Sequence, residues 1–286
     1  MRWVLVLAIA LATVVAGCGA SAPACELPAA PAEPYAWLWR VQAASGDGPV
    51  VWLFGTVHDV DGDDMPRAAW AALERSTVVA TELGDLEPSP DTLREVIRMP
   101  RGKGLDQQLP TDKWWELRDA LRGKIKEAEL ARVRPWYAMS LLTRTMSPPP
   151  DPQLDVAVVQ RAKARGLVVE HLETWEEQLP QVADNVGIPD LVEAIDARKT
   201  IRCDLARNRA AYAAGDEAWM MRAFQTERTK PLLGPRNERW LWRMEGYLKA
   251  DGAFVAVGIG HLLGDGGLPA MLARAGYRVE PPPPPR

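Results

Sequence analysis

The sequence predicts an α/β (α+β-like) fold, with a central mostly parallel or mixed sheet built from two similar halves and a helix-rich insert. Three observations predict it. Near both ends of the chain, apolar runs of strand length lack polar alternation, which is typical of strands covered on both faces. Helical patterns fill the middle. Two apolar runs end on the same pattern, a glycine followed three residues later by a histidine, so the two halves resemble each other.

The first half is predicted to be a β-α-β unit. Residues 50–57 form a continuous apolar run, which predicts a buried strand. Residues 65–76 have an amphipathic pattern that Pro66 opens, and residues 77–84 predict a second strand.

The middle of the chain is predicted to be helical, and the second half returns to the sheet. Helical patterns cover residues 111–123, 133–146, 154–166, 174–186 and 190–214. One strand, residues 166–173, interrupts them. A helix over 232–250 then leads to a strand, a glycine loop, a helix and a short strand within residues 253–280.

Composition and charge limit which classes of function the chain can have. The 286 residues are 25% charged and 47% hydrophobic, which is ordinary for a globular domain, here expected over residues 35–280. The formal net charge is −4 and there is no long basic run, so we expect no nucleic acid partner.

The two ends are predicted to lie outside the domain. Residues 1–17 have one early positive charge and a short apolar stretch, and the sequence VAGC resembles a bacterial lipobox, which predicts a signal peptide and a lipidated Cys18. Ordinary cleavage nearby and an uncleaved anchor are the alternatives. Residues 18–34 form a Pro/Ala-rich tether and residues 281–286 a polyproline tail. We therefore expect a bacterial envelope lipoprotein, anchored through its N-terminal lipid in the outer membrane and facing the periplasm.

Two further cysteines, Cys25 and Cys203, remain. In an oxidising compartment such a pair indicates a disulfide, which would attach the tether to the domain. They have no CxxC spacing, so a zinc site is the weaker interpretation.

The repeated glycine-histidine pattern places two imidazoles at strand ends. Gly55 precedes His58 by three residues, and Gly258 precedes His261 in the same way. Ligands of open α/β sheets bind outside the carboxyl ends of the strands, so both histidines are expected to face one crevice. A single histidine after a strand is more often structural, but its duplication favours a functional site.

Glu82 follows the second predicted strand, where an apolar run does not tolerate an unpartnered carboxylate. Together with His58 and His261 it predicts a site for Mn, Co or Zn that keeps a position open for water. Glu82 would then act as a ligand or as a general base. Alternatively, it caps the following turn or pairs with Arg236.

Six segments together resemble the TraB/PrgY/GumN family, which is related to the Tiki metalloproteases. They are FGTVH (54–58), TELGDL (81–86), RVRPWYAMSLL (132–142), LDVAVVQRAKARGLVVEHLETWEEQ (154–178), LLGPRNERWLWRM (232–244) and VGIGHLLGDGGLPAMLARAGYRVE (257–280). The resemblance implies a protease-like metal site in which His58 and His261 come from the paired GxxH motifs and Glu82 from the acidic motif.

The resemblance also implies catalytic roles for Arg236 and Asn237. Arg236 would bind a substrate carboxylate or stabilise an oxyanion; alternatively, it is one charge on a solvated helix whose start Pro235 marks. The family often has a glycine where this chain has Gln153 or Leu154 ahead of Asp155, so that loop is expected to differ. His171 lacks the glycine and is expected to be structural, although its strand could bring it or Glu173 near the crevice.

Two functions from different classes follow. The first is a metal-dependent hydrolase, most simply a peptidase acting on a peptide or protein with a metal-activated water. The second is a non-catalytic lipoprotein that binds or sequesters a peptide or small ligand on the same scaffold. The family relationship also keeps an esterase or a haem-binding role open. The chain has no HExxH, so a standard zincin is excluded, and it has no GxSxG nucleophile elbow of the α/β-hydrolase type.

Overall fold

The computed structural model describes residue 25 and residues 27–84, 86–102 and 104–283, so the predicted signal peptide (1–17) and Cys18 lie outside the described residues. The described residues contain one six-stranded sheet in the order β4-β3-β5-β2-β1-β6. Its strands are β1 (Leu38–Gln42), β2 (Val51–Thr56), β3 (Val78–Thr81), β4 (Val168–His171), β5 (Ala253–Gly258) and β6 (Arg278–Glu280). Neighbours from β4 to β2 are parallel, whereas β1 is antiparallel to both β2 and β6. The predicted mixed α/β fold is confirmed.

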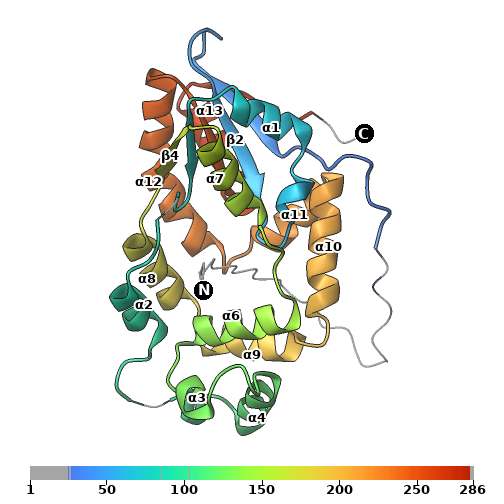
Figure 1. Cartoon of the computed structure of the whole chain (residues 1–286), viewed down its shortest axis with the longest axis vertical. Helices are drawn as coiled ribbons and strands as arrows, with labels where there is room; N and C mark the ends of the chain where they lie inside the picture. The colour runs from blue at the N-terminus through green and yellow to red at the C-terminus, as the bar shows by residue number, and fades with distance from the viewer. Residues whose placement is uncertain (1–24, 26, 85, 103, 284–286) are drawn as a thin grey trace.

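Helices make up most of the remaining described chain (Figure 1). They are α1 (Arg67–Glu74), α2 (Pro90–Ile97), α3 (Leu105–Gln108), α4 (Thr111–Ala120), α5 (Glu127–Leu130), α6 (Pro135–Met146), α7 (Leu154–Ala164), α8 (Trp175–Asn185), α9 (Ile188–Ala197), α10 (Ile201–Ala214), α11 (Glu217–Phe224), α12 (Lys230–Lys249) and α13 (Leu268–Arg274), with 3-10 turns η1 (Gly62–Asp64) and η2 (Ile259–His261). Among the described residues, no helix has the length and apolarity needed to cross a membrane.

Two of the predicted helix boundaries are wrong. The segment predicted as one stretch over residues 190–214 is two helices, α9 and α10, which a short turn at residues 198–200 separates. The helix predicted from residue 232 begins at Lys230, with Pro231 in its first turn and Pro235 inside it. Pro231 can occupy the first turn because the amide that proline lacks has no helical partner there.

Within the described part of the chain, the buried side chains form two hydrophobic clusters. One surrounds the sheet and includes strand residues such as Leu53 and Val255. The other lies in the insert, between residues 96 and 195, and is centred on large side chains such as Trp136 and Leu179. Figure 1 shows α3, α4, α6 and α9 gathered at one end of the molecule, away from the sheet. The insert therefore has its own core, and the sheet edge that faces it is where a site can form.

The two strands that carry the glycine-histidine pattern are direct neighbours. β2 and β5 pair in parallel, with Gly55 opposite Val257 and Thr56 opposite Gly258. A Cβ atom on Gly55 would clash with the side chain of Ile259, the first residue of η2. Glycine at position 55 thus lets the turn that carries His261 pack directly against β2.

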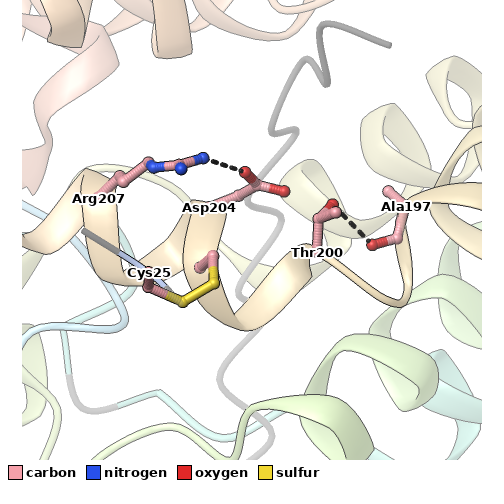
Figure 2. Close-up of a disulfide and its surroundings, with 6 residues drawn as sticks. Cys25, Ala197, Thr200, Asp204 and Arg207 are labelled. Atoms are coloured by element: carbon pink, nitrogen blue, oxygen red, sulfur yellow. Dashed lines mark hydrogen bonds and ion pairs between the residues drawn. A yellow bond between two sulfur atoms is a disulfide. The ribbon is translucent and has the colours of Figure 1, made fainter. Parts of the chain in front are cut away.

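A disulfide joins Cys25 to Cys203 in the first turn of α10 (Figure 2). The Cα atoms are 5.3 Å apart, an ordinary separation for a disulfide. The predicted pairing is present in the structure, and it fixes the described part of the tether to the helical side of the domain.

Candidate functional site

The four parallel strands end at one edge of the sheet, and a polar side chain follows each of them. Glu82 comes directly after β3, and His58 and Glu173 come two residues after β2 and β4. His261 ends η2, which continues from β5. The carboxyl ends of parallel strands open into one crevice, so chain segments more than 200 residues apart contribute to one site.

The imidazole of His261 is held in one tautomer by Asn237. The Asn237 amide nitrogen donates to the backbone oxygens of His261, at 3.2 Å, and of Gly266, at 2.8 Å. The amide oxygen is therefore the acceptor, and Nδ1–H of His261 donates to it at 2.6 Å. Burial, followed by the charge of Arg236, lowers the pKa of His261 to about 3. The ring is neutral, and its free Nε2 lies 3.8 Å from Glu82 Oε1.

Glu82 accepts three hydrogen bonds. Oε1 accepts from the backbone N–H of Gly258 at 2.9 Å, while Oε2 accepts from Gln178 at 3.1 Å and from Arg236 at 2.5 Å. Burial alone would raise the pKa of Glu82, but the charge of Arg236, the largest opposing influence, helps to lower it to about 2. Glu82 is thus an ionised carboxylate, and the predicted pairing with Arg236 is confirmed.

Arg236 lies between two carboxylates. Its Nε donates to Glu173 at 3.1 Å and its Nη2 donates to both Glu173 and Glu82 at 2.5 Å. Gln178 also donates to Glu173, at 2.9 Å, and so bridges the two acids. The guanidinium packs 4.7 Å from the ring centroid of the fully buried Trp240, and the same ring also packs against the imidazole of His261. Arg236 is 8% exposed, so this is a structured buried network and not a solvated helix start.

His58 is held by residues from the loop before α7 and from α7 itself. Its Nδ1 lies 3.5 Å from Asp155 Oδ2, and the side chain of Gln153 donates to its backbone oxygen. Burial would lower the pKa of His58, but the neighbouring Asp155 carboxylate raises it to about 9. The two histidines therefore differ in charge: His261 is neutral beside an amide and His58 is cationic beside a carboxylate.

Two cavities meet at the site. The first has a volume of about 150 Å³, and His58, Glu82, Arg236 and His261 all line it. The second has a volume of about 380 Å³ and extends toward α7 and the start of α8. Thr56, His58, Glu82 and Gln178 line both cavities, so two of the predicted site residues, His58 and Glu82, lie at the boundary between them.

The structure brings most of the predicted site residues together. Asn237 lies behind His261, while His171 lines neither of the two cavities, in accord with a structural role. Sequence reasoning assigned no site role to Gln178 or Asp155. In the sequence, Asp155 stands out only because it lies at the start of a helix. An acidic side chain there stabilises the helix terminus and does not by itself indicate a functional site.

The distances between the candidate donor atoms satisfy part of what a divalent cation site requires. Bonds of about 2.1 Å to nitrogen and oxygen can join donors up to about 4.2 Å apart, and His261 Nε2 and Glu82 Oε1 are separated by 3.8 Å. His58 lines the same cavity and would supply a third donor nitrogen after releasing the proton that Asp155 favours, because a metal binds only the neutral imidazole. Within the described ranges, however, no three His, Cys, Asp or Glu side chains are already clustered closely enough to hold an ion.

A comparison with protein-family models gives a match to the TraB/PrgY/gumN family over residues 37–281. The match covers both glycine-histidine patterns, Glu82, Glu173 and the Arg236–Asn237 pair. Comparisons with curated proteins and with solved structures give no match.

Proposed function

Because the chain belongs to the TraB/PrgY/gumN family, we propose that it is a metal-dependent hydrolase of the cell envelope, and specifically a peptidase. The observation that carries the proposal is that His261 is neutral and is held in one tautomer. Its Nδ1–H is committed to Asn237, so a neutral imidazole presents Nε2 to a cavity that Glu82 and His58 also line. An outer-shell oxygen on the far nitrogen is the usual support of a metal-binding histidine.

In this proposal His58, Glu82 and His261 would hold Mn, Co or Zn, and the ion would supply activation of a water molecule for attack on a carbonyl carbon. Asn237 positions His261. Arg236 keeps Glu82 ionised and fixes its orientation through the second acid, Glu173. Hydrolysis adds the water across the amide bond: its oxygen ends on the carbonyl carbon, and the leaving nitrogen gains a proton.

Metal content tests this proposal directly. The full-length chain would be dialysed after exposure to Mn, Co and Zn and its bound metal measured by elemental analysis. We expect near-stoichiometric metal in the wild type and loss of most of it in His58→Ala and His261→Ala. His171→Ala is the matched control, because it removes the remaining histidine from outside both cavities. Wild-type protein that retains no metal would contradict the proposal.

A second candidate function is binding without catalysis. The specific observation in its favour is that Arg236 is already neutralised by Glu82 and Glu173, so this cation is not free to stabilise an oxyanion. A protein that only sequesters a peptide or small ligand would bind it in the same cavity whether or not metal is present. Ligand binding that a chelator leaves unchanged, without any hydrolysis, would favour this function.

The envelope location is also a proposal. It rests on the lipobox-like sequence that ends at Cys18, and the Cys25–Cys203 disulfide supports it because disulfides persist in oxidising compartments. Replacing Cys18 with Ser should abolish incorporation of labelled fatty acid and move the protein from the membrane fraction to the periplasmic fraction. Unchanged labelling would contradict a lipid at Cys18.

A further inference from the structure

The first cavity has an apolar wall next to the candidate site. Side chains from α8, α10, α11, α12 and η2 form it: Val182, Leu205, Phe224, Leu232, Leu233 and Ile259. Its volume is about 150 Å³. An apolar cavity of this size in another protein accepts benzene. The wall therefore matches one phenylalanine- or leucine-sized side chain.

The same cavity contains a cation that has no acidic partner among the described residues. Arg144, in the last turn of α6, lines it together with Thr143 and Ser147. No carboxylate of the described residues lies within 4.0 Å of Arg144, whereas Arg236 contacts two. Partial burial lowers the pKa of Arg144, and the one opposing influence is the hydroxyl of Tyr137. A half-buried guanidinium of this kind is well suited to a carboxylate supplied by a ligand.

We infer that this cavity binds the C-terminal residue of a peptide, with an apolar side chain against the wall and the free α-carboxylate on Arg144. The inference rests on the proposed peptidase function and gives it a substrate class: the enzyme is a carboxypeptidase that prefers a large apolar last residue. Water adds across the last amide bond, so the products are the shortened peptide, with a new carboxylate, and one free amino acid.

The second cavity provides space for the rest of the peptide. It begins at the shared boundary of Thr56, His58, Glu82 and Gln178 and is the larger of the two, at about 380 Å³ against about 150 Å³. A chain whose last residue fills the small cavity would place its last amide bond at this boundary and its preceding residues in the large cavity. An interior peptide segment would offer Arg144 no charge, which is why the end of a chain is the better occupant.

Matched peptides test the inference. The metal-loaded full-length protein would receive acyl peptides that end in Phe or Leu, as free acids and as C-terminal amides. We expect kcat/KM to favour the free acids by about tenfold to a hundredfold, the range of a charge-assisted hydrogen bond. Arg144→Gln should lose this preference and Arg144→Lys should retain part of it. Arg165→Gln, an exposed arginine at the end of α7, is the control and should behave as wild type.

A binding measurement separates this inference from the proposed function. Calorimetry with N-acetylphenylalanine and its amide needs no hydrolysis, and wild type should bind the acid more tightly by a similar factor. If peptides are hydrolysed but acids and amides react and bind equally, the C-terminal inference is overturned and the peptidase proposal stands. If nothing is hydrolysed but Arg144→Gln alone loses acid binding, the carboxylate site stands and the peptidase proposal fails. Equal acid binding by wild type and Arg144→Gln overturns the inference in either case.

Discussion

Replacing Arg236 with Met should destabilise the fold strongly at neutral pH. The variant keeps the hydrophobic stem but leaves Glu82 and Glu173, whose side chains are 17% and 1% exposed, without their shared cation. Breaking a buried ion pair by removing one partner typically costs about 3–5 kcal/mol. We expect a loss in this range in the free energy of unfolding at pH 7.5, with a chelator present so that bound metal does not compensate.

The free energy of unfolding of the variant should change with pH in a direction that follows from the two carboxylates. In the wild type the pKa of Glu82 is lowered from 4.5 to about 2, so its contribution is complete above pH 4.5 and is lost as the pH falls toward 2. Burial already raises the pKa of Glu173 in the wild type, and without Arg236 it should raise the pKa of both acids further, so the folded variant binds protons that the unfolded chain does not. Its stability should therefore rise on going from pH 7.5 to pH 5, by at most about 1.4 kcal/mol per pH unit for each such carboxyl.

Urea unfolding at the two pH values measures both effects. Arg243→Met is the matched control, because Arg243 lies on the same helix but contacts the exposed Trp242. The control should change stability by less than about 0.5 kcal/mol, as surface substitutions usually do. A loss below about 1 kcal/mol for Arg236→Met, or a loss that does not change with pH, would refute the view that Arg236 neutralises two buried carboxylates.

Three further predictions concern the parts that hold the site. Asn237→Ala frees the far nitrogen of His261 and should weaken Mn or Zn binding by about tenfold to a hundredfold in a metal titration; unchanged affinity would mean that Asn237 does not support a metal-bound His261. Cys203→Ser opens a loop of 178 residues and should lower the free energy of unfolding, measured in urea, by up to about 5 kcal/mol. Added reductant should then have no effect on the stability of the variant. A variant whose stability still falls with reductant would contradict the pairing. Gly55→Ala places a methyl group against the η2 turn and should cost about 1–3 kcal/mol, seen as a lower Tm in calorimetry; an unchanged Tm would show that the turn can move.

The sheet edge was predictable because it depends on local patterns. Continuous apolar runs that stop on Gly55 and Gly258 predict buried strand ends, and the carboxyl edge of such strands is a general ligand position. Glu82 was predictable for a related reason, since an acid at the end of an apolar run requires a partner. The short strand β1 was missed, because its five residues offer too short a pattern to identify a strand.

The supporting residues could not be predicted from the sequence in the same way. Asp155 meets His58 through the packing of the loop before α7 on η1, where the backbone of Gly62 donates to Pro152. Arg144 stands out by its lack of an acidic partner among the described residues, and a partner is a tertiary property. Helical periodicity shows that such side chains are polar, but it does not show which of them meet.

The disulfide at the first turn of α10 has a mechanical consequence for an anchored protein. If the chain is held by a lipid at its N-terminus, tension on the tether reaches the domain at Cys203 before it reaches β1. The pulling force is then borne by a covalent bond on a helix, and the hydrogen bonds of β1 with β2 and β6 carry no load. Reducing the disulfide would shift that force to the sheet, where strands can be peeled away one pair at a time.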